Sequence, residues 1–187
     1  MRVFVALDLP EEVHRALADF VRTLEPTCAG ARWTRTSGIH VTLKFIGEAP
    51  PEKVERIKET LAAIALAEPV ELRFRDVGFF PNARHPRVFW AGIEASGNLA
   101  ELAVAVEERL ETLGIPREQR PFKPHLTLAR FKSEQGLARL DDAVRRYPSL
   151  EFGAMRTGEF HLYQSHLKPG GAEYARLATF SFAGGAR

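Results

Sequence analysis

The sequence contains a single cysteine, Cys28, among its 187 residues. One cysteine cannot form an intrachain disulfide, and it cannot supply the paired thiolates of a Cys-x-x-Cys zinc site. No apolar run approaches the roughly 20 residues that a membrane-spanning helix needs. We therefore expect a protein of the reducing cytoplasm that has no membrane partner.

A strong excess of one charge is also missing. The chain has 26 Lys and Arg residues against 24 Asp and Glu residues, so its formal net charge is only +2. This balance is compatible with an anionic substrate but does not by itself argue for nucleic-acid binding. Hydrophobic residues make up 45% of the chain and charged residues 27%, as is typical of a soluble globular protein.

Strand-like and helix-like apolar patterns follow one another along the chain. Alternation with a period of two predicts strands, and apolar residues at helical spacing predict amphipathic helices. The expected strands span residues 2–9, 39–46, 70–80, 87–95, 125–131, 158–167 and 173–182. The expected helices span residues 10–24, 50–64, 98–114 and 135–147.

The chain also contains an internal repeat. The segment RVFVA at 2–6 recurs as RVFWA at 87–91, and HVTL at 40–43 recurs as HLTL at 125–128, both after 85 residues. A long unit that occurs only twice indicates fused halves and not a solenoid. We predict one bilobal domain over 1–187, with halves at roughly 1–84 and 85–187 related by a pseudo-twofold axis. The final strands could be exchanged between the two lobes.

Each copy of the second segment places a histidine and a threonine two residues apart in a strand. Such residues point to the same side, so His40 shares a face with Thr42, and His125 with Thr127. A twofold relation would bring the two pairs face to face across a cleft. In-line displacement at phosphorus needs a base and an acid on opposite sides, and histidine suits both tasks near neutral pH. The threonine hydroxyls can donate hydrogen bonds to the non-bridging oxygens.

Structural and metal-binding interpretations compete with this one. A lone histidine on an apolar strand is more often a packed core residue, and one His-x-Thr is weak evidence. Two copies of the motif, at the same offset as the repeated RVF segments, favour a functional role over a structural one. No Asp, Glu or Cys stands beside either motif, and no HExxH is present, so we expect no metal and no cofactor. The remaining histidines are assigned no role: His14, His85, His161 and His166.

The chain resembles the two-histidine phosphoesterase superfamily, and within it the 2′-5′ RNA ligase group, also called RNA 2′,3′-cyclic phosphodiesterases. The resemblance rests on HVTLKFIGE, HLTLARF, the opening RVFVALDLP and the later LYQSHL, and it covers essentially the whole chain. It implies an α+β fold of two αβ lobes, each an antiparallel sheet with helices on the outer side, around a central cleft. It implies metal-independent hydrolysis of RNA 2′,3′-cyclic phosphates to 2′-phosphomonoesters, with RNA 3′ ends or cyclic nucleotides as substrates.

The same resemblance implies a role for each motif residue. His40 would be the proton donor to the 3′ oxygen, His125 the proton acceptor that activates water, and Thr42 and Thr127 the phosphate-binding hydroxyls. Symmetry alone does not separate the two histidine roles. Two alternatives stay open: joining of RNA ends through a 2′-5′ linkage, and a module that holds RNA ends or nucleotides without turnover. A monomer is expected, because the duplication already supplies a twofold.

Lys44 and Arg130 are further candidates for substrate binding. Alternation places Lys44 on the same face as His40, where its ammonium could hold a phosphate or the RNA backbone. Arg130 follows the second motif, but simple alternation points it away from His125. A bulge or the end of the strand would be needed to turn it back.

Three further residues lie in segments that resemble the family. Tyr163 and Ser165 belong to LYQSHL, and we consider both as substrate-binding candidates. An aromatic ring in such a segment could stack on a nucleobase. For Phe45, core packing is the favoured interpretation.

Overall fold

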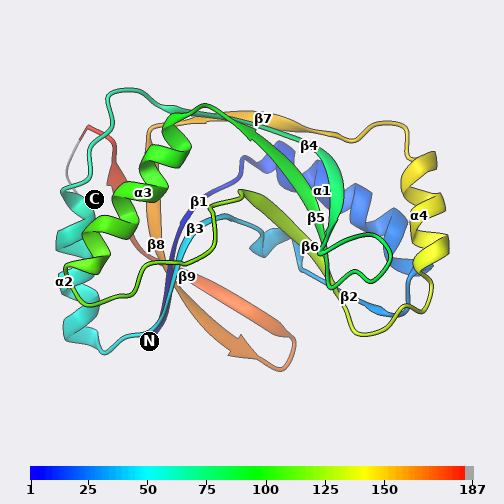
Figure 1. The fold of residues 1–187 in the computed structure, drawn as a ribbon, viewed down its shortest axis with the longest axis horizontal. Helices are drawn as coiled ribbons and strands as arrows, with labels where there is room; N and C mark the ends of the chain where they lie inside the picture. Colours follow the sequence, from blue (N-terminus) through cyan, green and yellow to red (C-terminus); the bar gives the residue numbers. More distant parts are fainter. Residues whose placement is uncertain (184–187) are drawn as a thin grey trace.

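The computed structural model describes residues 1–183, which form two antiparallel sheets and their flanking helices (Figure 1). The strands are β1 (Arg2–Leu7), β2 (Ala31–Trp33), β3 (Val41–Glu48), β4 (Val70–Phe80), β5 (Val88–Ala95), β6 (His125–Phe131), β7 (Glu151–Thr157), β8 (Glu159–Lys168) and β9 (Gly171–Ser181). The helices are α1 (Glu11–Leu24), α2 (Pro51–Ala62), α3 (Asn98–Glu111) and α4 (Leu137–Arg146), with short 3₁₀ turns η1 (Glu25–Thr27) and η2 (Thr36–Gly38).

Strand order mixes the two halves of the chain. One sheet has the order β3-β1-β8-β9, and the other has the order β2-β6-β5-β4-β7. The late strands β8 and β9 thus extend the sheet of β1, while β4 pairs with β5 in the sheet of the second half. The two antiparallel sheets with their helices confirm the predicted two-lobed α+β fold. The domain prediction for 1–187 stays a prediction.

Two strands, β2 and β7, lie where the sequence predicted irregular chain. Both occupy the edge of their sheet, so each has only one neighbour. β2 has three residues, too few to show an alternating pattern. β7 contains Gly153 at a φ of +126°, and glycine weakens the sequence signal of a strand.

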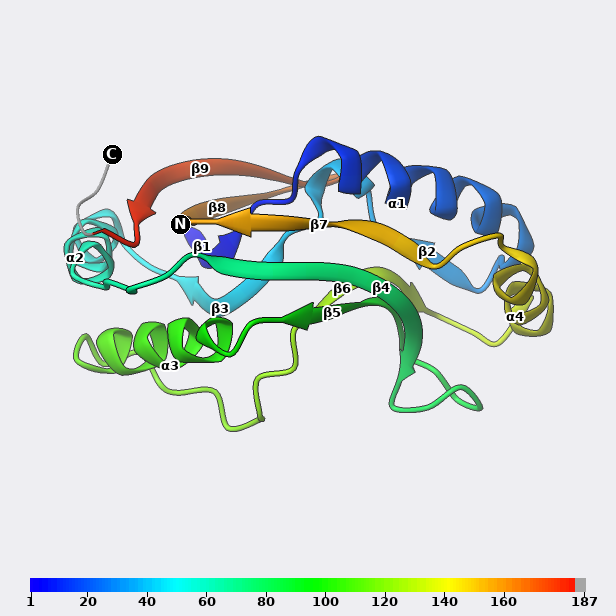
Figure 2. The ribbon, with the colours of Figure 1, turned by 90° about the horizontal axis from the view of Figure 1, so that it is seen from above.

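The helices bury apolar stripes against the sheets. In α1 the buried residues recur at the spacing of one helix face: Val13, Leu17, Phe20, Val21 and Leu24. Figure 2 shows α1 running beside β7, whereas α2 and α3 lie together at the opposite end of the molecule from α4. Within residues 1–183, no helix combines the length and the apolar character needed to cross a bilayer.

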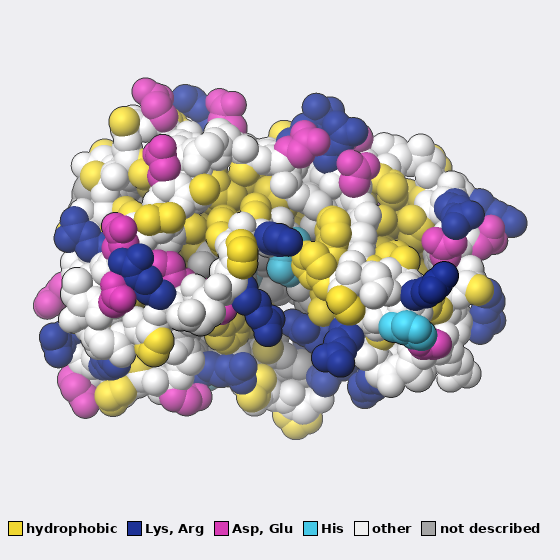
Figure 3. All heavy atoms as spheres, in the orientation of Figure 1, with side chains coloured by type: hydrophobic (Ala, Val, Ile, Leu, Met, Phe, Trp, Pro, Cys, Tyr) yellow, Lys and Arg dark blue, Asp and Glu magenta, His cyan; other side chains and the backbone are white. Residues whose placement is uncertain are grey.

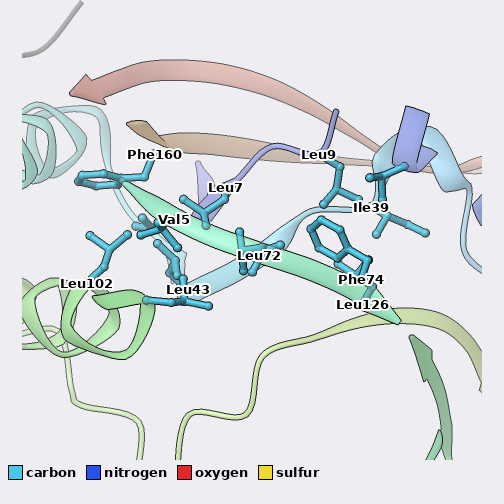
Figure 4. Packing of buried hydrophobic residues seen from close by; sticks show 14 of the residues in the cluster. Val5, Leu7, Leu9, Ile39, Leu43, Leu72, Phe74, Leu102, Leu126 and Phe160 are labelled. Atoms are coloured by element: carbon cyan, nitrogen blue, oxygen red, sulfur yellow. The ribbon is translucent and has the colours of Figure 1, made fainter. Parts of the chain in front are cut away.

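A single buried cluster connects both sheets. Figure 4 shows side chains from distant parts of the chain meeting there: Val5, Leu7, Leu9, Ile39, Leu43, Leu72, Phe74, Leu102, Leu126 and Phe160. Burial of each such side chain contributes about 1.5–3 kcal/mol before conformational entropy is subtracted. Because the two sheets share this core, β3 and β6 hold fixed positions relative to each other.

Candidate active site

Both His-x-Thr pairs line one cavity of about 250 Å³. His40 directly precedes β3 and Thr42 lies in it, whereas His125 and Thr127 lie in β6 of the other sheet. Figure 3 shows a hollow near the middle of the molecule, with imidazole atoms inside it and Lys and Arg side chains along its border. The fold therefore brings together four side chains that are far apart in sequence.

Backbone carbonyls hold the two imidazoles in equivalent ways. Nδ1 of His40 lies 2.9 Å from the carbonyl oxygen of Gly38, and Nδ1 of His125 lies 2.7 Å from that of Lys123. A carbonyl oxygen only accepts hydrogen bonds, so each Nδ1 must donate. In both rings Nε2 is left for proton transfer. Each carbonyl belongs to the residue two positions before its histidine, so the internal repeat extends to these hydrogen bonds.

Aromatic rings surround the two histidines to different extents. The His40 side chain is only 12% exposed, with the ring of Tyr174 perpendicular to it at a centroid distance of 5.3 Å. The ring of Phe80 lies edge-on to His125 at 5.1 Å. Burial lowers the pKa of His40, because the charged imidazolium loses hydration, and the nearby carboxylate of Asp8 opposes this change.

Asp8 forms the centre of a polar cluster behind His40. One carboxylate oxygen, Oδ1, accepts a hydrogen bond from the Tyr163 hydroxyl and lies 3.8 Å from Nε2 of His40. The other, Oδ2, accepts from the guanidinium of Arg176 and lies 3.7 Å from Nε2 of His161. Burial and the hydrogen bond to Asp8 raise the pKa of Tyr163 to about 12, so the phenol stays protonated and keeps donating.

His161 completes this cluster from β8. Its side chain is buried, and its Nδ1 lies 3.0 Å from the hydroxyl oxygen of Thr179. Burial lowers the pKa of His161, again against the influence of Asp8. Sequence reasoning missed Asp8, His161 and Arg176. In the sequence, each of these residues is marked only by being a polar residue next to or inside an apolar strand. That pattern does not predict that β1, β8 and β9 are neighbouring strands.

The described residues show no group of three or more His, Cys, Asp or Glu side chains that could hold a metal ion.

In sequence, residues 7–90 and 93–174 match the model of the LigT-like phosphoesterase family. These two segments contain both His-x-Thr motifs. The chain belongs to the LigT-like phosphoesterase family.

Two similar proteins of known name are both RNA 2′,3′-cyclic phosphodiesterases. The chain is 37% identical over 180 residues to an RNA 2′,3′-cyclic phosphodiesterase of Archaeoglobus fulgidus, covering 96% of this chain and 99% of the relative. It is 39% identical over 191 residues to an RNA 2′,3′-cyclic phosphodiesterase of Thermus thermophilus, covering 98% and 91%. The predicted resemblance to the two-histidine phosphoesterases is thereby confirmed.

Solved structures agree with this membership. The crystal structure of TT0787 of Thermus thermophilus superposes with a TM-score of 0.79 at 35% identity, covering 98% of this chain and 99% of that one. Escherichia coli LigT complexed with 3′-AMP superposes with a TM-score of 0.78 at 28% identity, covering 96% and 97%.

The LigT-like phosphoesterase has a bulge in β3 directly after the first motif. In the pairing with β1, Ala6 faces Thr42 but the preceding Val5 faces Lys44, so Leu43 is an extra residue. A bulge moves the residues that follow it to the other face of the strand. The ring of Phe45, which is 55% exposed, therefore lines the cavity. The interpretation of Phe45 as a core residue was wrong.

The same bulge makes the prediction for Lys44 wrong. Its side chain is only 6% exposed and points away from the cavity. Nζ lies 2.7 Å from a carboxylate oxygen of Glu107 in α3 and 2.7 Å from the carbonyl oxygen of Pro116. Lys44 therefore connects β3 to α3 and is not available to a phosphate.

An equivalent bulge in β6 brings Arg130 to the cavity. Phe89 faces Ala129 and Trp90 faces Thr127, which leaves Leu128 as the extra residue. Alternation alone pointed Arg130 away from His125, and the bulge reverses this. Arg130 is exposed and lines the cavity. The bulges occur at positions 85 residues apart, so the repeat also includes this irregularity.

Neither Tyr163 nor Ser165 is among the residues that line the cavity. Tyr163 is 5% exposed and packs behind His40 at a ring distance of 4.6 Å, so its faces are already covered. Ser165 pairs with Arg2 near the far end of β1. Their family-like segment places Tyr163 next to Asp8, and neither residue is positioned to touch a substrate in the cavity.

Proposed function

We propose that this protein hydrolyses RNA 2′,3′-cyclic phosphate ends to 2′-phosphomonoesters by acid–base catalysis. The observation that carries the proposal is one cavity lined by two imidazoles whose Nε2 atoms make no backbone hydrogen bond to any residue of 1–183. RNA 3′ ends or cyclic nucleotides are the substrates we propose, and the names of the relatives support this choice. The expected monomer and the cytoplasmic location stay predictions.

The reaction needs one water and no co-reactant. Nε2 of His125 takes a proton from the water as its oxygen attacks phosphorus. The bond from phosphorus to the 3′ oxygen breaks on the opposite side, and Nε2 of His40 gives its proton to that oxygen. A 2′-phosphomonoester and a 3′ hydroxyl result. Histidine can serve in both places because its ordinary pKa is near 6.5.

Asp8 supports the assignment of the acid to His40. A carboxylate near Nε2 stabilises the protonated imidazolium, as the acid requires. Among residues 1–183 no carboxylate lies within 4.0 Å of His125, so this stabilisation of the charged form is specific to His40. The anionic substrate would further favour the protonated form of His40 when it enters the cavity.

Other residues lining the cavity suit a phosphate and a nucleobase. The hydroxyls of Thr42 and Thr127 would stabilise charge on the non-bridging oxygens, with Lys123 and Arg130 adding positive charge. Phe45 is 55% exposed and offers an aromatic surface to a base, with the guanidinium carbon of Arg2 5.5 Å from the centre of its ring. Its ring already stacks on Phe4, with centroids 5.6 Å apart and planes 15° from parallel.

The decisive experiment follows the products of an RNA that ends in a 2′,3′-cyclic phosphate, in the presence of EDTA. We expect a 2′-phosphate end and full activity with the chelator. His40→Ala and His125→Ala should each lower the rate roughly 10²–10⁴-fold while RNA binding persists. His85→Ala is the matched control, because it removes an exposed imidazole outside the cavity.

Four outcomes would each contradict part of this proposal. Full hydrolysis by either cavity variant would rule out acid–base catalysis by these residues. Loss of turnover in EDTA would indicate a required metal, and a 3′-phosphate product would reverse the assignment of the leaving oxygen. Binding without any turnover by the unaltered protein would support the binding-module alternative.

A further inference from the structure

A second hollow, of about 500 Å³, adjoins the cavity of the two histidines. The two share four of their lining residues: Thr34, Gly38, Arg130 and Tyr174. The two hollows are therefore neighbours that meet at these four residues. The segment from β2 to η2, the strand β6 and the turn between β8 and β9 form its walls.

Three arginines line this second hollow: Arg32, Arg35 and Arg130. Within the part of the chain that the structure describes, none of them has a carboxylate partner within 4.0 Å. Some other arginines at the surface are paired, for example Arg145 with Asp141 and Arg146 with Asp142. Glu25 is the acidic residue of the lining, so the hollow has a clear positive excess.

Two of these arginines face each other across a strand pair. Arg32 of β2 and Arg130 of β6 are directly opposed in the antiparallel register. Like charges in this position are destabilising, unless an anion lies between or beside them. Both side chains are exposed, so an incoming phosphate can reach them.

The third arginine, Arg35, lies beside two glycines. Its guanidinium packs against the turn between β8 and β9, where a Cβ on Gly170 would come within 2.8 Å of Nη2. A Cβ on Gly171 would lie 3.6 Å from Nε, and this residue has a φ of +120°. Glycine at both positions therefore leaves room for the guanidinium beside the turn.

We propose that this second hollow, defined by Arg32, Arg35 and Arg130, binds the backbone phosphates of the RNA strand that leads to the reacting end. The inference rests on the proposed function. A 2′,3′-cyclic phosphate is the 3′ end of its strand, so the remaining nucleotides must leave the cavity on one side. The adjoining hollow supplies unpaired guanidinium groups, which suit phosphate oxygens through paired hydrogen bonds. The preferred substrate is thus an oligonucleotide and not a mononucleotide.

The test compares kcat/KM for a nucleoside 2′,3′-cyclic phosphate with that for a short RNA carrying the same end. The unaltered protein should prefer the RNA, and more strongly at low salt. Arg35→Gln and Arg32→Gln should each lower this preference by about tenfold, as expected for one lost charged hydrogen bond. Each should also reduce the dependence of log Kd on log salt by about one unit.

Arg56→Gln is the matched control. Arg56 is an exposed arginine of α2 that lines neither hollow, and its loss changes the net charge equally. It should leave the preference for RNA at the unaltered value. Equal loss on both substrates in Arg32→Gln and Arg35→Gln would overturn the proposal, as would an unaltered protein that does not prefer RNA.

A binding measurement separates this proposal from the proposed function. Fluorescence anisotropy with a 2′-phosphate-ended RNA and a matching mononucleotide needs no turnover. If neither cyclic phosphate were hydrolysed, the proposed function would fail. Weaker RNA binding by Arg35→Gln than by Arg56→Gln would still support the second hollow, and equal binding would overturn it.

Discussion

Asp8 Oδ1 lies 3.8 Å from Nε2 of His40, the nitrogen that remains free for proton transfer. His125 has no such neighbour among the described residues, although its motif and its backbone hydrogen bond are equivalent. The two halves of the repeat therefore differ in the carboxylate beside the motif histidine. An internal duplication supplies two similar imidazoles, and the carboxylate of Asp8 lies beside one of them, where it opposes the effect of burial on the pKa of His40.

Asp8→Asn should move the alkaline side of the pH–rate profile to lower pH. The acid must be protonated, so the rate falls as pH rises through the pKa of His40. Asp8 raises that pKa against the effect of burial, and its neutral isostere removes this influence. The measurement is kcat/KM for a cyclic phosphate across the pH range. Its two apparent pKa values belong to the coupled histidine pair.

Tyr163→Phe is the control for this prediction. It removes a hydrogen bond to Asp8 but keeps the carboxylate beside His40. The alkaline limb should then show no shift to lower pH. If Asp8→Asn left the limb in place, or moved it to higher pH, His40 would not be the acid that Asp8 supports.

Lys44→Ala should reduce stability and not catalysis. Its ammonium is buried and paired with Glu107, so truncation leaves a carboxylate without its partner. Loss of one member of a buried pair costs about 3 kcal/mol. Urea denaturation should show this decrease, whereas kcat/KM should change by less than about twofold.

A double-mutant cycle with Glu107→Ala identifies the pair. The double variant should lose less free energy of unfolding than the two single variants added together, because they share one interaction. A large loss of kcat/KM in Lys44→Ala with unchanged stability would instead return Lys44 to the substrate site.

Phe45→Ala should weaken substrate binding. The exposed ring lines the cavity, and loss of a stacked base costs about 1–3 kcal/mol. We expect KM to rise by roughly tenfold with a smaller change in kcat, and Phe45→Trp to retain binding. Leu167→Ala is the control, because that side chain is 72% exposed outside the cavity. An unchanged KM in Phe45→Ala would exclude a stacking role.

Gly78→Ala should shift the aromatic side chains that pack against the ring of His125. Gly78 of β4 faces Trp90 of β5, and a Cβ at Gly78 would overlap the indole ring. Trp90 packs on Phe80 at 5.2 Å, and Phe80 packs edge-on against His125 at 5.1 Å. Displacing the indole should lower stability by about 1–3 kcal/mol and reduce kcat as well.

Gly97→Ala is the control variant for Gly78→Ala. Nothing lies within 4 Å of a Cβ at Gly97, so this substitution should leave both quantities nearly unchanged. Thermal unfolding and steady-state kinetics on the two variants measure the effects. If Gly78→Ala matched Gly97→Ala in both, the packing of Trp90 on Phe80 and of Phe80 on His125 would not support the site.

Local sequence patterns predicted most of the elements. Apolar alternation indicated the motif strands, and helical spacing indicated α1 to α4. The edge strands β2 and β7 were missed, because a short strand or one containing glycine has almost no pattern of its own. The repeat at an offset of 85 residues predicted two similar lobes and left the final strands open to exchange between them, but it did not predict that β4 would join the sheet of the second half.

By itself, the sequence determined which chemistry the protein carries. Two His-x-Thr pairs in matched strands supply two imidazoles and two hydroxyls, because neighbours two residues apart in a strand share a face. Only the tertiary structure decided which later side chains join them. A bulge depends on the partner strand, so it turned Phe45 and Arg130 toward the cavity and Lys44 away from it. Asp8 lies beside His40 because β1 and β3 are neighbouring strands. Contacts of this kind, between segments far apart in the chain, produce no local sequence pattern.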